Sequence, residues 1–213
     1  HAREILAALA MLAGAAQVPQ AQSPGLPVYG GGFSTGITFA GNVAFTGDET
    51  HPGDGTVLGG SATLGVGVLS ITGLVSHWNP SGEGDGRTSV GGNAALKVFG
   101  GPLIPLAVYL QAGASRTSEP DDATRTEIPV GVNVALTIPS PVFALKPWLA
   151  PRLHVTRSSN PQGSGTNEVF AFSAGVDLTL LSGLGFRAAW EQIKNQDPTI
   201  AFGVAYGIRV RGL

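Results

Sequence analysis

The side chains of this sequence with the chemistry for ion pairing or ion binding share one face of predicted strands. They occupy the positions opposite an alternating apolar face: Lys97, Arg152, His154, Asp177, Arg187, Glu191 and Arg209. In a narrow interior such groups either neutralise one another, because an unpaired buried charge is costly, or form the charged constriction of a small pore. Simple strand register would place Asp177 near Arg187, whereas Arg152 would reach Glu191 only if the strands tilt strongly. We favour mutual neutralisation.

Histidines close in sequence to aspartate or serine are the candidates for an enzyme site. They are His51 with Asp48 and Asp54, His77 with Ser76, and His154 with Ser158. None of these has a recognisable spacing, and a general base must lie within hydrogen-bond reach of its partner. The absence of cysteine excludes thiol catalysis and thiolate metal sites. We therefore predict no catalytic residue, no metal site and no cofactor.

The composition is unusual for a water-soluble surface. Charged residues make up 12% of the 213 residues, against roughly 25% in an ordinary soluble domain. Apolar residues are not in excess at 43%, and 32 glycines take much of the missing share. The net charge of −2 gives no basic footprint, so we predict no nucleic-acid partner.

The last third of the chain, Glu168–Val210, sets the pattern for the rest. Apolar and small residues alternate over a dozen positions before Leu181-Ser182-Gly183, and they do so again in the two segments that follow. A two-residue period over this length predicts long strands with one oily face. The predicted apolar face includes Phe170, Phe172, Val176, Phe202 and Val204.

The same alternation predicts about ten strands along the chain. The expected ranges are 33–45, 57–66, 69–78, 89–99, 104–115, 128–138, 145–157, 168–180, 184–191 and 200–210. Eight strands is the alternative, because Leu74 is out of phase in the third segment and Pro147 and Pro151 interrupt the seventh. Polar loops, including 116–126 and 158–167, follow odd strands, and short turns follow even strands.

A soluble barrel with an oily interior would alternate in the same way, so the direction of the oily face must be argued. The opposite face is rich in Gly, Ala, Ser and Thr, which suit a narrow lumen better than a solvated exterior. Strands of ten to thirteen residues match the 9–11 or so that a tilted membrane strand needs. We predict an all-β, closed, up-and-down antiparallel transmembrane β-barrel with its oily face outward.

Three regions are expected along the chain. Residues 1–21 are predicted to be a signal peptide, because their apolar run, Ile5–Ala16, has the length of a signal-peptide core. The run is too short to span a membrane as a helix, which needs about 20 residues. A short buried helix is the alternative for this run. Residues 22–29 read as a Pro/Gly linker, and residues 30–213 as the barrel.

With long polar loops at one end and short turns at the other, the chain resembles the small outer-membrane β-barrel proteins of Gram-negative-type bacteria. The resemblance implies an outer-membrane location, with membrane lipid and the barrel-assembly machinery as partners. It departs at Leu213, because such barrels commonly end in an aromatic residue. The expected role is structural or that of a narrow, porin-like channel for small solutes. A surface binding or adhesion barrel acting through its loops is the alternative, and an outer-membrane enzyme comes third.

Overall fold

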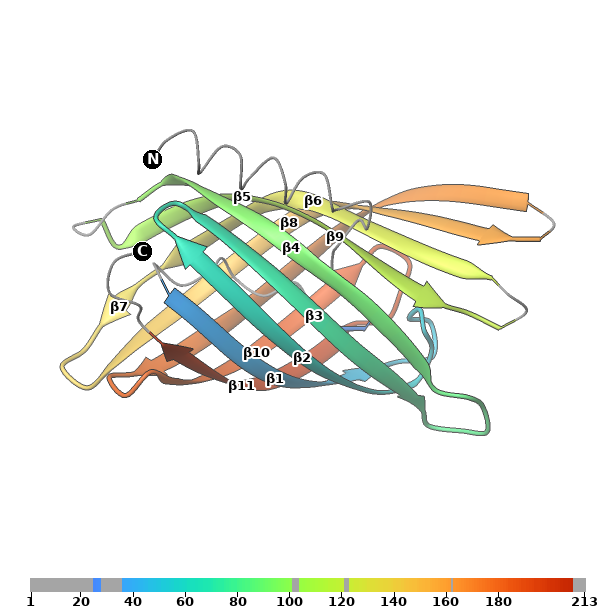
Figure 1. Ribbon diagram of the computed structural model, residues 1–213, viewed down its shortest axis with the longest axis horizontal. Coiled ribbons are helices and arrows are strands. Elements are labelled where there is room, and N and C mark those ends of the chain that lie inside the picture. The colour runs from blue at the N-terminus through green and yellow to red at the C-terminus, as the bar shows by residue number, and fades with distance from the viewer. Residues whose placement is uncertain (1–24, 28–35, 101–103, 121–122, 162, 209–213) are drawn as a thin grey trace, which may run out of the picture.

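The computed structural model describes residues 25–27, 36–100, 104–120, 123–161 and 163–208, which form one curved antiparallel sheet (Figure 1). Its strands are β1 (Gly36–Thr46), β2 (Gly55–Val66), β3 (Leu69–Pro80), β4 (Arg87–Phe99), β5 (Leu106–Ser118), β6 (Thr124–Leu136), β7 (Ile138–Pro139), β8 (Phe143–Asn160), β9 (Gly163–Leu180), β10 (Leu184–Ile193) and β11 (Thr199–Ile208). In this part of the chain there is no helix long and apolar enough to cross a membrane.

The sheet closes on itself. Strands that follow one another in sequence are neighbours, β1 pairs with β11 from Ile37–Ile208 to Phe45–Ile200, and β6 pairs with β8. β7 is a two-residue continuation beyond β6 that also pairs with β8, so ten strands make the wall. The predicted ten-stranded closed barrel is confirmed, and the eight-stranded alternative is wrong.

The oily face points outward. Phe170, Phe202 and Val204 are each about half exposed, at 57%, 49% and 49%. Ala171, next to Phe170, and Ala201, next to Phe202, are fully buried. Phe172 is more covered because it packs edge-on against Trp190, with ring centroids 6.2 Å apart. Exposed large hydrophobic residues, aliphatic or aromatic, occur on every long strand. In water such a continuous apolar surface would be an association hazard, so its natural environment is lipid.

Three aromatic residues that break the sequence alternation have separate explanations. The register of β4 against β5 shifts between Lys97 and Phe99, and this irregularity leaves Phe99 50% exposed on the outer face. Trp78 and Trp148 instead face inward and are buried. Leu74 shares the inward phase of Trp78, so the third strand is regular, with one apolar residue on its lumenal face.

Two expected loops are wrong. The segment 158–167 is mostly strand, because β8 and β9 pair as far as Asn160–Gly163, and this hairpin projects beyond the rest of the barrel (Figure 1). The segment 116–126 is also largely strand, since Ser118 pairs with Thr124. The polar composition of the two segments suggested loops. A pair of strands that projects into water needs no apolar face, so it can have the same composition. We call the end that carries this hairpin the rim and the opposite end the turn end.

Inward-facing glycines leave room for the few large lumenal side chains. A Cβ on Gly175 would collide with the Trp148 ring and with the Ala188 carbonyl, and a Cβ on Gly203 would meet Asn42 and Arg187. At these two positions glycine is therefore a packing requirement, because each accommodates a side chain from a neighbouring strand.

Substituting Gly175→Ala should lower the free energy of unfolding by about 1–3 kcal/mol, because overpacking forces Trp148 or the strand backbone to move. Urea unfolding of the folded chain in lipid, followed by heat-modifiable gel mobility, measures this. The matched control is Gly73→Ala, whose added Cβ meets nothing within 4 Å. Equal stability of the two variants would contradict the packing argument.

Candidate functional site: the filled lumen and its charged rim

A buried ion pair spans the middle of the lumen. The Arg152 guanidinium contacts the Glu191 carboxylate, and their side chains are only 0% and 3% exposed. Arg152 also donates to Ser173 Oγ at 2.6 Å, and Ser173 donates to Glu191 at 3.2 Å. Arg152 and Glu191 lie on β8 and β10, so the arginine reaches across β9, where its neighbours are the small Ala171 and Ser173. The Arg152–Glu191 contact therefore does not depend on strand tilt alone, because the small residues of β9 between the two strands also allow it.

A second group lies nearer the turn end. Arg187 Nε is 3.6 Å from Asp177 Oδ1, and the two residues are direct register partners of β9 and β10. Lys146 lies opposite Asp177 in the β8–β9 register. Lys97 faces the same lumen from β4, next to Tyr109 of β5. Lys146 was not among the expected site residues, although its place on the alternating face could have revealed it. Arg209 lies outside the described residues.

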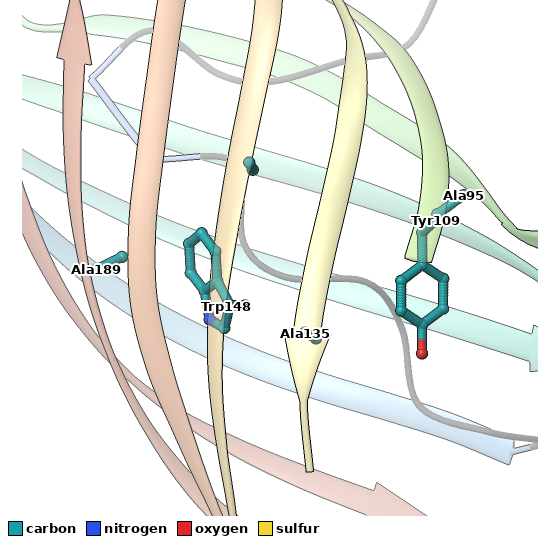
Figure 2. Packing of buried hydrophobic residues seen from close by; sticks show 6 residues of the cluster. Ala95, Tyr109, Ala135, Trp148 and Ala189 are labelled. Carbon is teal, nitrogen blue, oxygen red and sulfur yellow. The ribbon is translucent and has the colours of Figure 1, made fainter. Parts of the chain in front are cut away.

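An aromatic layer separates these two groups. Trp148 and Tyr109 project into the lumen and are 2% and 9% exposed, and Figure 2 shows them with the alanines that surround them. Those alanines are Ala95, Ala135, Ala150 and Ala189. The alanines on nearby strands leave room for the two rings inside the lumen.

Polar side chains close to this layer are also shut off from solvent. Gln111 and Asn133 are 5% and 0% exposed, and their side-chain amides have no hydrogen-bond partner among the described residues. Buried amides normally find partners, and ordered water is the usual one where protein groups are missing. The lumen beside the layer is therefore polar in character although it is narrow.

A third charged group occupies the rim side of the lumen. Arg125 Nε is 2.9 Å from Glu127 Oε1, and the other oxygen of Glu127 is 3.8 Å from His154 Nε2. Glu127 and His154 are 3% and 1% exposed. Sequence reasoning placed His154 correctly on the inward face but assigned Arg125 and Glu127 no role, since 116–126 was expected to be loop and the sixth strand to begin at 128.

The mouth at the rim is crossed by residues 47–54, the connection between β1 and β2. On one side, the Glu49 amide donates to Asp197 Oδ2 at 3.0 Å and the His51 amide to Gln196 Oε1 at 3.1 Å. On the other side, the His51 ring lies 3.3 Å from Glu119, which also binds Arg87 at 3.0 Å. Connections from distant parts of the barrel thus hold this loop from both sides.

An apolar side chain from before β1 occupies the lumen below that loop. Leu26 is 5% exposed and packs with inward-facing Val57, Trp78, Ala44 and Ala201. Gly59 makes the room, because a Cβ there would collide with Leu26. The Arg87 guanidinium lies over the Trp78 ring, 5.2 Å from its centroid. The described part of the expected linker thus lies inside the barrel.

Burial lowers the pKa of His51 to about 4, and the nearby Arg125 and Arg87 act in the same direction, with Glu127 partly opposing them. The Glu119 carboxylate would favour the charged ring, but burial and the two arginines outweigh it. His51 is therefore neutral at pH 7, and its 3.3 Å contact with Glu119 is not an ion pair at that pH.

The structure does not bring the candidate Ser–His pairs together. Ser76 is buried in the lumen, whereas the neighbouring His77 points outward and bonds Thr88 Oγ1 at 2.9 Å. His154 is buried against Glu127, while Ser158 is exposed beyond the rim. The His51 ring lies 3.3 Å from Glu119. None of these histidines is paired with a serine in the described residues.

A groove of about 640 Å³ lies on the outer wall. Its lining is mainly outward-facing and apolar, with Val43, Val176, Leu178, Phe186 and Phe202 among its residues. A recess of this chemistry and position suits hydrocarbon chains and offers nothing to orient a polar solute.

Comparison with known proteins supports the same architecture. No protein-family model and no curated protein matches the sequence. The beta domain of the Bordetella autotransporter Brka superposes with a TM-score of 0.54 at 16% identity, covering 82% of this chain and 100% of that one. This chain has the fold of a bacterial outer-membrane β-barrel.

Two further structures with this barrel fold match less well. The translocator domain of autotransporter NalP from Neisseria meningitidis gives a TM-score of 0.48 at 13% identity, covering 84% of this chain and 90% of that one. The N-terminal barrel domain of Pseudomonas aeruginosa OprF gives 0.39 at 13% identity, covering 82% and 98%. At these identities the likeness concerns the fold alone.

Substituting Glu191→Leu should destabilise the barrel by about 3–5 kcal/mol, because Arg152 would keep a buried charge without its counter-ion. The double variant Arg152→Met/Glu191→Leu should recover most of that loss. Urea unfolding in lipid measures both. Asp177→Asn is the matched control at the more exposed pair and should cost less. If Glu191→Leu alone is at least as stable as the double variant, the pairing argument is wrong.

Stability should fall as the pH drops from 6.5 to about 4, in part through His51. The unfolded chain takes up this proton near pH 6.5, whereas the folded chain resists until about pH 4, so acid favours unfolding in that window. The variant His51→Gln should show a flatter dependence of the urea midpoint on pH. Parallel curves for both proteins would show that His51 contributes nothing.

Proposed function

We propose that this chain is an integral protein of the bacterial outer membrane with a structural, non-conducting role. The observation that supports the proposal is that large side chains at successive levels of the lumen are almost completely shut off from solvent. Arg152 is 2% exposed, Trp148 2% and Asn133 0%. The lining of an open aqueous channel would be wetted, as it is in barrels of 16–18 strands.

The outer-membrane location is proposed from the outer wall. Each of the ten strands of the wall is hydrogen-bonded to a neighbour on both sides, as a lipid environment requires. Lipid is thus one partner, and the barrel-assembly machinery is the other that this location implies. The proposed role is also non-enzymatic, since the histidines face carboxylates, threonine or the lumen interior with no serine partner in the described chain.

Planar-bilayer recording tests this role against a narrow channel for small solutes. The full chain should insert without conductance steps. The loop 47–54, the Arg152–Glu191 ion pair and the aromatic layer each block the lumen at a different level. Removing the loop tip Asp48–Gly53 alone should leave it silent, since the deeper layers remain. A barrel of wide bore in the same bilayer is the positive control. Stepwise conductance from the intact chain would favour the narrow channel and defeat the closed-barrel proposal.

A further inference from the structure

Two arginines face outward at the rim, on the side of the barrel formed by β5, β6 and β8. Arg116 and Arg157 are exposed and share the outward phase of Leu110 and Leu153 on their strands. Both pair in register with Thr126, which lies between them on β6. Neighbouring strands are about 4.8 Å apart, so the two Cα atoms are separated by roughly 10 Å. Two arginine side chains can converge on one group over that distance.

The pair lies at the upper border of the apolar belt. Four residues down the strands, the same rows hold exposed Val130, Leu153 and Phe170. On one side of the pair the row continues to apolar Val90, and on the other to polar Thr166. Aromatic residues of outer-membrane barrels mark the level where hydrocarbon gives way to headgroups, so the arginines beyond Phe170 are at headgroup height.

The charge of this pair is not balanced within the described residues. Neither arginine forms an ion pair there, and Arg116 makes one long hydrogen bond, 3.5 Å from Nη2 to Thr124 Oγ1. Glu168 is the nearest outward carboxylate by register, diagonal to Arg157 on β9, but it makes no ion pair with it in this part of the chain. Arg125, one residue before Thr126, points inward and is paired with Glu127.

We propose that Arg116 and Arg157, with Thr126 between them, bind the phosphate of a phosphorylated lipid in the outer leaflet. The guanidinium group donates two parallel hydrogen bonds to phosphate oxygens, which makes arginine suited to this group. The source is lipid, because both side chains point sideways from the barrel wall, above its apolar belt, where acyl chains can lie against Val130 and Leu153 while the headgroup meets the arginines.

The inference rests on the proposed outer-membrane location, and the experiment separates the two. The full chain is folded in detergent, its folding is checked by heat-modifiable mobility, and its insertion into bilayers is checked separately. Bisphosphorylated lipid A and its dephosphorylated form are then titrated and the bound lipid is counted by native mass spectrometry. Failure to insert would defeat the location. Insertion with equal retention of both lipids would defeat only the phosphate site.

The variants sharpen the test. Arg116→Gln/Arg157→Gln should bind phosphorylated lipid A about tenfold more weakly or worse, because charge-assisted hydrogen bonds are lost. Lys194→Gln, which removes an exposed cation from the β10–β11 connection, should bind as the parent does. Unchanged binding by the double variant, or equal displacement of lipid by inorganic phosphate, would overturn the proposal. If the double variant does not fold, the comparison of the two lipids on the parent chain decides.

Discussion

Closure of the sheet between β1 and β11 is the constraint on which the rest of the structure depends. In hydrocarbon each unpaired backbone group costs several kcal/mol, so a sheet with free edges could not remain there. Nine consecutive residue pairs, from Ile37–Ile208 to Phe45–Ile200, remove those edges. Closure at ten strands also fixes the diameter, and the diameter decides how much side-chain volume the lumen can hold.

A lumen of fixed, small width explains the unusual composition better than any requirement of the outer wall. Each bulky inward residue needs a position on a nearby strand with almost no side chain, as Trp148 does at Gly175 and Leu26 at Gly59. Charged residues meet the same limit and have the added cost of dehydration, so Arg152 lies in contact with Glu191. The abundance of small residues and the scarcity of charge thus have one geometric cause.

The strand periodicity made the fold and its sidedness predictable, because the outward and inward positions differ in chemistry on every strand. It did not show where polar strands end: nothing in 158–167 separates a solvated ribbon from a loop. It gave the face of Arg152 and Glu191 but not their contact, which depends on small residues in a third strand. Leu26 could not have been placed, since its burial comes from tertiary packing with no local pattern.

The alternation that fixes the fold also divides the chemistry of the rim. Consecutive residues on one strand face different media: Arg125 is directed to the lumen and Thr126 to the outside, and Thr156 and Arg157 divide in the same way. The inward cations Arg125 and Arg152 contact carboxylates, because an unpaired buried charge is costly. Outward cations need no internal partner, since solvent or a lipid headgroup can supply it. The proposed closed lumen would leave the rim and the outer face as the surfaces on which such a barrel can bind a partner selectively.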